Sequence, residues 1–298
     1  MQNAWQHARS NLMAFQRLPL AVVMGTNEIA SAVAVALNRS GYAVVLSHDP
    51  MPPVIRRGMA FYDALFGDPC EVGGLIGERA ENLLEIADVL TRRERVAVTP
   101  LTLTDLLALR AADVLVEARM QKQQITPDFR RLARLTIGLG PKFVVGVNCD
   151  IAVETLPART GALVEHGVTA EPDGQSRDLG GVGRERFVYS DRPGIWRSPI
   201  DIGMWVPKDF VLGRLEGMPT RAPMDGFIRG VARDGVRVPA GVKIIEIDPR
   251  KRAACWTGTD ERGRALAQAC LKAIRQREKA KGRAADRFAD PPLVAVQR

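Results

Sequence analysis

The stretch from residue 18 to residue 49 constrains the fold of this chain more than any other. An apolar run, LPLAVVMG, ends at Gly25, apolar residues at helical spacing follow in EIASAVAVALNRSG, and a second apolar run, YAVVLSHD, comes next. A strand, a helix and a strand in this order are typical of a βαβ unit, whose strands lie parallel and whose crossover is right-handed. The stretch therefore predicts an α/β fold with a parallel sheet.

The alternation of strand and helix continues through the first half of the chain. TLTDLLALRAA predicts a helix that begins near Thr102 or Thr104, DVLVEARM predicts the next strand, and TIGLGPKFVVGVNCDIAVET predicts two strand-forming runs around a Gly-Pro turn. We therefore expect a Rossmann-like open parallel sheet in an α/β domain over residues 1–160. A loop-rich connector over residues 161–196 follows, because EPDGQSRDLGGVGRERF has no helical period.

Short strands and tight turns dominate residues 197–250. RSPIDIG and RAPMDGF form a weak repeat, and RDG and PAG separate the apolar runs after the second copy. The pattern resembles the biotinyl/lipoyl carrier fold, a barrel-sandwich hybrid of two quasi-repeats. That resemblance implies a small β module, but the exposed hairpin lysine of the carriers is missing, so we expect no covalently carried cofactor. Residues 251–298 complete the chain with an amphipathic C-terminal helix and a basic tail.

Composition excludes several classes of protein. No apolar run approaches the roughly 18 residues that span a bilayer, so we expect no membrane span and a cytoplasmic location. The net charge is +8, but acids interrupt the basic runs and the stretch KAIRQREKAKGRAADR has no aromatic side chain, so we expect no nucleic-acid partner. The four cysteines are scattered without a CxxC pair, which argues against disulfides and a zinc site. We expect no metal site, and since no Ser-His-Asp or Cys-His arrangement emerges, any catalytic residues are unknown.

The glycine turn at residues 25–30 resembles a dinucleotide-binding turn with one part changed. Such a turn uses glycines to reverse the chain, to let the backbone approach a pyrophosphate, and to pack helix on strand. Gly25 and Ala30 serve the first and third purposes, but Asn27 takes the middle position and Glu28 adds a negative charge. Asp49 lies where a ribose-binding acid is expected. Two interpretations stay open, a nucleotide site and a structural strand-to-helix corner.

Cations gather at the predicted carboxyl end of the sheet. Arg56 and Arg57 follow the extended segment PPVI, Lys122 follows DVLVEARM, and Lys142 lies in the turn GLGPKF. Planar guanidinium groups suit a phosphate or a carboxylate, and open α/β sheets bind ligands at this edge. The alternative is that one arginine forms a salt bridge and the other is solvated. The candidate binding residues are therefore Gly25, Asn27, Glu28, Asp49, Arg56, Arg57, Lys122 and Lys142.

Several blocks, taken in order, resemble one known family. PPVIRR with FYDALF, DVLVEARMQKQ, LTIGLGPKFVVGVNCDIAVET and RAPMDGFIRGVARDGVRVPAGVKIIEIDPR look like the YqeB-type accessory proteins of selenium-dependent molybdenum hydroxylase systems, which are grouped with XdhC/CoxF-type maturation factors. The resemblance covers about residues 20–275. The chain resembles a divergent member, because Asn27 and Lys142 stand where the family has glycines.

The resemblance implies a function in maturing a bacterial molybdenum hydroxylase of the xanthine dehydrogenase or carbon monoxide dehydrogenase class. It implies a client molybdoenzyme or another protein as partner, and a molybdopterin-type cofactor or a nucleotide as ligand. Two alternatives stay open: an NAD(P)-dependent oxidoreductase, and a scaffold that has lost small-molecule binding. A homo-oligomer is also open, and the sequence does not decide whether the protein is an enzyme.

Overall fold

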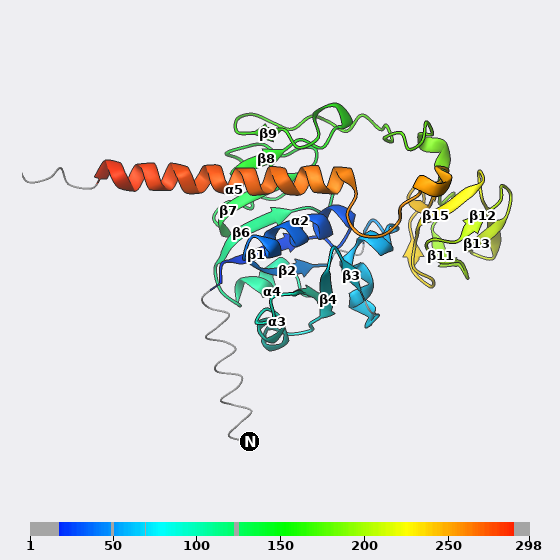
Figure 1. The fold of residues 1–298 in the computed structure, drawn as a ribbon, viewed down its shortest axis with the longest axis horizontal. Helices are drawn as coiled ribbons and strands as arrows, with labels where there is room; N and C mark the ends of the chain where they lie inside the picture. Colours follow the sequence, from blue (N-terminus) through cyan, green and yellow to red (C-terminus); the bar gives the residue numbers. More distant parts are fainter. Residues whose placement is uncertain (1–17, 49–50, 69, 122–124, 289–298) are drawn as a thin grey trace, which may run out of the picture.

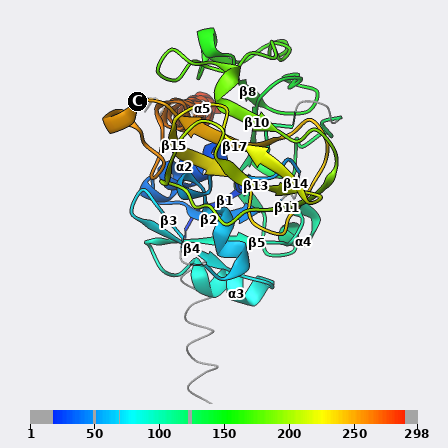
Figure 2. The ribbon, with the colours of Figure 1, turned by 90° about the vertical axis from the view of Figure 1, so that its right-hand side faces the viewer.

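The computed structural model describes residues 18–48, 51–68, 70–121 and 125–288, which form two bodies (Figure 1). The α/β body contains strands β1 to β9 and helices α2 to α5, and the β body contains strands β10 to β17. The β body lies at one end of the molecule, and α5 extends toward the other end (Figure 1). Figure 2 views the molecule from the end where the β body lies.

One sheet organises the α/β body. Within the described residues it has nine strands in the order β3-β4-β5-β2-β1-β6-β7-β8-β9. The strands from β4 to β8 in that order run parallel, and β3 and β9 pair antiparallel at the two edges. The strands are β1 (Leu20–Met24), β2 (Ala43–Ser47), β3 (Glu71–Val72), β4 (Leu75–Arg79), β5 (Arg95–Thr99), β6 (Ala112–Glu117), β7 (Ala133–Leu139), β8 (Ile151–Val153) and β9 (Leu163–Val164).

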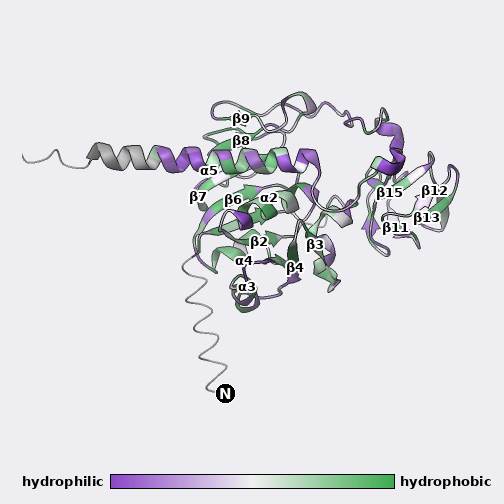
Figure 3. Ribbon diagram, in the orientation of Figure 1, coloured by the Kyte–Doolittle hydropathy of each residue, from purple (hydrophilic) through white to green (hydrophobic). Residues whose placement is uncertain are grey.

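Helices cover both faces of this sheet. Successive residues of a strand point to opposite sides, so the apolar strands present apolar side chains on both faces. Val23 packs in the core beneath α2 and α5, whereas Val22 packs in the core that includes α3 and α4. Figure 3 shows the apolar strands at the centre of the sheet. The helices are α2 (Glu28–Arg39), α3 (Leu83–Val89), α4 (Leu103–Leu107) and α5 (Glu261–Phe288), with short 3-10 helices at η1 (Arg57–Met59), η2 (Phe61–Phe66), η3 (Pro157–Arg159), η4 (Arg184–Arg186) and η5 (Lys251–Ala253).

The C-terminal helix α5 packs against α2. Its apolar side chains Leu266, Cys270 and Ile274 are buried, at the helical spacing seen in the sequence. The two helices approach closely at Gly263, where an added Cβ would lie 2.9 Å from the Ala32 Cβ. Among the helices that the structure describes, none is long and apolar enough to cross a membrane.

The β body consists of two four-stranded antiparallel sheets in the described residues, ordered β10-β17-β15-β12 and β14-β13-β11-β16. They enclose a separate core around the fully buried Trp196, with Leu212, Ile228 and Ile245 against it. The strands are β10 (Phe187–Tyr189), β11 (Gly194–Arg197), β12 (Trp205–Val206), β13 (Val211–Leu215), β14 (Met218–Arg221), β15 (Gly226–Val231), β16 (Arg237–Val238) and β17 (Lys243–Asp248).

The predicted fold class is wrong in two respects. The main sheet is mixed rather than an open parallel sheet, because hairpins add antiparallel strands at its edges. Gly73 and Gly74, both with positive φ (58° and 78°), form the two-residue turn between β3 and β4. The second body is a pair of four-stranded antiparallel sheets rather than a small biotinyl/lipoyl-like barrel-sandwich module. The predicted division of the chain at residues 160, 196 and 250 stays a prediction.

Candidate functional site

A cavity of about 1340 Å³ lies between the two bodies. Residues 25–29 and 51–56 line it on the side of the α/β body, and residues 239–243 line it on the side of the β body. Residues 175–180 of the connector and residues 259–262 around the start of α5 contribute further walls. Ligand pockets form preferentially at such junctions between domains, so this cavity is the candidate site.

The glycine turn borders this cavity, and its helix end is closed by a side chain of the protein. Asn27 Oδ1 accepts hydrogen bonds from the amides of Ile29 (2.9 Å) and Ala30 (3.0 Å), and Asn27 Nδ2 donates to the carbonyl of Ala118 at 2.8 Å. Gly25 has a φ of 109°, and an added Cβ would lie 3.2 Å from the Ala118 backbone. Because Asn27 occupies two amides that an anion would otherwise bind, the geometry favours the structural interpretation of this turn.

Glu246 of β17 is the centre of an ion cluster that borders the cavity. Its side chain is fully buried (0% exposed). Its carboxylate accepts hydrogen bonds from Arg56 Nε at 2.5 Å, Arg56 Nη2 at 3.1 Å and Arg186 Nε at 3.2 Å, and Arg229 Nε lies 3.6 Å from Oε1. Burial by itself raises the pKa of Glu246, but the charges of Arg56, Arg229 and Arg186 outweigh burial and hold that pKa below its usual value.

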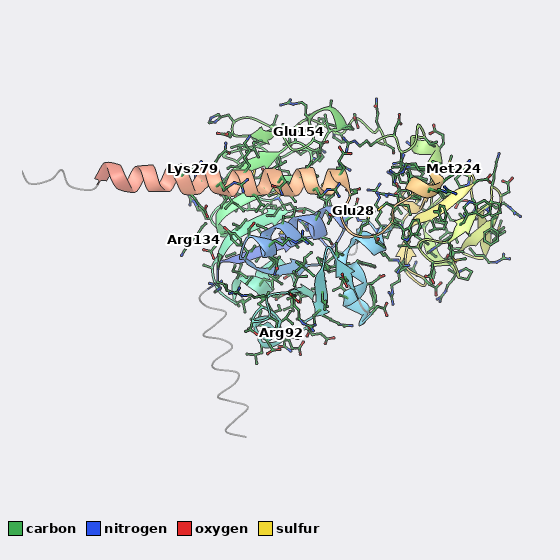
Figure 4. The ribbon with its side chains drawn as sticks, viewed as in Figure 1. Glu28, Arg92, Arg134, Glu154, Met224 and Lys279 are labelled. Atoms are coloured by element: carbon green, nitrogen blue, oxygen red, sulfur yellow. The ribbon has the colours of Figure 1, made fainter. Side chains whose placement is uncertain are left out.

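Arg56 joins the two bodies through this cluster. Its Nη1 lies 3.0 Å from Glu28 Oε1 and 3.6 Å from Asp260 Oδ2, so one guanidinium contacts α2, β17 and the residue before α5. Figure 4 shows Glu28 at the end of α2 that faces the β body. Burial opposes the charge of Arg56, but Glu246 and Glu28 raise its pKa above the usual value. The central ion cluster comprises Glu28, Arg56, Arg186, Arg229, Glu246 and Asp260.

Arg262 adds a cation that this cluster does not balance. The central ion cluster contains three arginines and three carboxylates, so its formal charges cancel. Arg262 lines the cavity, and its Nη2 donates to the backbone carbonyl of Thr155 at 3.2 Å. Within the described part of the chain, no ion pair includes Arg262. Burial lowers the pKa of Arg262, and the nearby charge of Glu28 compensates only in part.

The predicted binding residues divide between the cavity and other places. Gly25, Asn27, Glu28 and Arg56 line the cavity. Arg57 donates to Asp63 Oδ2 at 2.6 Å and to the carbonyl of Val231 at 2.9 Å, so it links the bodies at a different point. Lys142 is exposed and is not among the residues that line the cavity. Asp49 and Lys122 lie outside the described residues.

Sequence reasoning missed the acids and arginines that the structure brings to Arg56. Glu246 was detectable in part, since it interrupts the apolar strand KIIEID, and a charge at a buried position requires a partner. Arg229 gave the same kind of signal, since it interrupts the apolar strand GFIRGV. Arg186 and Arg262 gave no comparable signal, because other charged residues flank them in the sequence. In the part of the chain that the structure describes, no group of three or more His, Cys, Asp or Glu side chains could hold a metal ion.

Comparison with known proteins gives weak structural matches and one clear relative in sequence. No family model matches the chain. Similar solved structures include a succinylglutamate desuccinylase from Silicibacter sp. TM1040 (11% identical, TM-score 0.23, 77% of this chain and 84% of that chain). They also include the ectoine utilization protein EutE (DoeB) from Ruegeria pomeroyi (13% identical, TM-score 0.24, 77% and 86%). With TM-scores this low, these matches assign neither a fold nor an activity to this chain.

The expected function is corrected by these comparisons. Several of the solved structures found are named as desuccinylase, aspartoacylase or ectoine utilization proteins, and not as maturation factors or nucleotide-binding proteins. The expectation of a molybdenum hydroxylase maturation factor that binds a nucleotide or a phosphate-bearing cofactor was therefore wrong. The capped helix end at Asn27 agrees with this correction, because it leaves the turn poorly suited to a pyrophosphate.

The curated relative is described as the uncharacterized protein YqeB of Escherichia coli (strain K12). It is 31% identical over 256 residues, which are 86% of this chain and 47% of the relative. The chain thus spans about half the length of the curated relative it matches. Nothing in this match supports a grouping with XdhC/CoxF-type factors, and the chain is similar to YqeB over most of its own length.

Proposed function

We propose that this protein binds a small organic acid with one carboxylate in the cavity between its two bodies, and that Arg262 receives the carboxylate. The observation that carries the proposal is the placement of Arg262. It is a half-buried cation on the cavity wall, its hydrogen bond goes to the neutral carbonyl of Thr155, and within the described residues no ion pair includes it. A bound carboxylate offsets the free energy that partial burial of this charge costs.

The charge of the site favours a monoanion. The three arginines of the central ion cluster are already matched by Glu28, Glu246 and Asp260, so Arg262 contributes the one unmatched positive charge of this group. A phosphate monoester carries up to about two negative charges at neutral pH and would leave an excess near Glu28. A carboxylate matches Arg262 in charge and also in shape, since a guanidinium binds it through two parallel hydrogen bonds.

An apolar part of the lining favours an apolar body on the ligand. Pro52, Pro53, Val54 and Leu156 line the cavity on the side of the α/β body, and Val242 lines it on the side of the β body. The cavity volume of about 1340 Å³ is ample for a small organic molecule. A carboxylic acid with an aliphatic or aromatic body fits Arg262 together with this apolar part of the lining.

The test is a thermal-shift screen followed by calorimetric titration. The probes are hexanoate and benzoate as monocarboxylates, glutarate as a dicarboxylate, and inorganic phosphate and AMP as phosphates, all at one ionic strength. A monocarboxylate is expected to raise Tm and to bind measurably, since a ligand at about 100 times its Kd stabilises a protein by about 2.7 kcal/mol. If the phosphates bind and the carboxylates do not, the proposal is wrong.

Two variants on the same helix separate the site from a general effect of charge. Arg262→Gln removes the cation and is expected to abolish carboxylate binding, with the far-ultraviolet circular dichroism spectrum unchanged. Arg275→Gln removes an exposed arginine farther along α5 and is expected to bind as the unmodified protein does. Equal affinity of all three proteins for the same carboxylate would contradict the assignment of Arg262.

We also propose that the protein is located in the cytoplasm. Support comes from the four cysteines, which are all free thiols, as is usual in a reducing compartment.

A further inference from the structure

The outer face of the sheet β14-β13-β11-β16 carries an unusual set of side chains. Alternation along the strands and the register across them place a common group of residues on this side. The group, which we call the arginine face, consists of Ile195, Arg197, Val211, Arg214, Pro219, Arg221 and Arg237. All seven residues are exposed, and none of them lines the cavity between the bodies.

Two of these arginines oppose each other directly. Arg197 on β11 and Arg214 on β13 are cross-strand partners in the antiparallel register. Like charges in this position destabilise a sheet, whereas opposite charges stabilise it. Arg197 pairs with Asp234 at 3.4 Å, but both side chains are more than half exposed (64% and 54%), so water screens this pair. Arg214 donates to the backbone carbonyl of Gly217 at 2.9 Å, which supplies no negative charge.

Among the described residues, neither Arg221 nor Arg237 forms an ion pair with a carboxylate. Arg221 donates to the backbone carbonyl of Asp209 at 2.8 Å. Arg237 lies opposite Ile195, an apolar residue, in the pairing of β16 with β11. The face therefore concentrates positive charge around apolar side chains, and Ile195 and Val211 are each 36% exposed.

We propose that the arginine face docks an acidic segment of a partner protein that also carries apolar side chains. Carboxylates of the segment complement the four guanidinium groups, which bind them through two parallel hydrogen bonds. Apolar side chains of the segment cover Ile195 and Val211, which a purely ionic ligand leaves in water. A single-stranded nucleic acid fits less well, because the outward-facing residues of these four strands include no aromatic ring on which a base stacks.

The test measures fluorescence anisotropy of labelled probes with the full chain. The probes are a synthetic peptide of Glu-Glu-Leu repeats, a peptide of Glu-Glu-Ser repeats, and single-stranded DNA of the same length as the peptides. The Glu-Glu-Leu peptide is expected to bind most tightly, and its affinity falls as salt concentration rises. Tightest binding by the DNA, or equal binding by the two peptides, would overturn the proposal.

The double variant Arg197→Gln/Arg214→Gln gives a signature that a merely structural role does not produce. It is expected to weaken binding of the Glu-Glu-Leu peptide about tenfold, because two charged contacts are lost. It is also expected to raise the Tm of the free protein, because it relieves the repulsion between the two opposed arginines. Loss of affinity together with a gain of stability supports a docking face.

The matched control is Arg93→Gln/Arg275→Gln, which removes two exposed arginines of the α/β body and gives the same net charge. It is expected to leave the affinity for the Glu-Glu-Leu peptide unchanged. An equal loss of affinity in the control would show that net charge alone drives binding. That outcome, or unchanged affinity in the Arg197→Gln/Arg214→Gln variant, refutes the arginine face as a docking surface.

Discussion

The ion cluster between the two bodies makes Glu246 the side chain on which the stability of the interface most depends. Glu246→Gln keeps the size and shape of the side chain but removes its charge. Arg56, Arg186 and Arg229 then lose the carboxylate on which all three converge. Removing one partner of a buried ion pair typically costs about 3–5 kcal/mol, because the other charge stays buried without compensation.

The lower part of that range is expected here. Glu246 is fully buried, so water cannot replace the lost carboxylate. However, Arg56 keeps Glu28 at 3.0 Å, and Arg229 keeps Asp260 at 3.2 Å. We expect Glu246→Gln to lower the free energy of unfolding by about 3 kcal/mol. Since each kcal/mol shifts Tm by roughly 2–4 °C in a large domain, Tm falls by about 6–12 °C.

The dependence of this destabilisation on pH shows whether loss of the Glu246 charge causes it. The pKa of Glu246 in the folded protein lies below its usual value, so its ionised form stabilises the fold above the unfolded-state pKa of about 4.3. This contribution disappears as the pH falls through the folded-state pKa. The difference in Tm between the unmodified protein and Glu246→Gln is therefore largest near neutral pH and shrinks below about pH 4.

Thermal and urea unfolding at several pH values measure both effects, with Glu81→Gln as the control. Glu81 pairs with Arg79 at 2.7 Å, but the two side chains are 60% and 43% exposed. Such an exposed pair contributes at most about 1 kcal/mol. If Glu246→Gln and Glu81→Gln destabilise the protein equally, or if the effect of Glu246→Gln does not change with pH, the reasoning is refuted.

Two further predictions concern the start of α2 and the cysteines. Asn27→Ala removes the cap over the amides of Ile29 and Ala30 and is expected to lower the free energy of unfolding by about 1–2 kcal/mol; an unchanged urea midpoint contradicts this. At pH 8, Ellman's reagent is expected to react quickly with the exposed Cys255 alone. Burial raises the pKa of Cys70 to about 11 and the pKa values of Cys149 and Cys270 to about 12. The other three thiols should react only in denaturant, and a second fast thiol in the native protein would count against their burial.

Local patterns in the sequence predicted several elements correctly. The two apolar runs are strands β1 and β2, they pair in parallel, and the periodic segment between them is α2. The predicted start near Thr102 is confirmed, since Thr102 and Asp105 form a capping box at α4. These features depend on residues close in sequence, where periodicity and capping act.

Features that depend on pairing between distant segments were predicted less well. The antiparallel strand β3 comes from two residues before a Gly-Gly turn, which is too short to show a period. The two sheets of the β body depend on cross-strand pairing, such as that of β10 with β17, which strand content alone does not specify. The fold class was therefore wrong although many of its strands were right.

For the candidate site, too, the sequence predicted some features and the tertiary structure decided the others. Sequence alone placed Arg56 and the altered turn of Gly25, Asn27 and Glu28 at one edge of the sheet, and the cavity borders all four residues. It could not tell whether Arg56 was free to bind an anion. Only the tertiary structure decided this, because Glu246, which lies 190 positions away in the chain, takes the Arg56 guanidinium. A buried charge is balanced by whichever partner the fold brings near, and that partner is set by packing between the two bodies rather than by any local pattern.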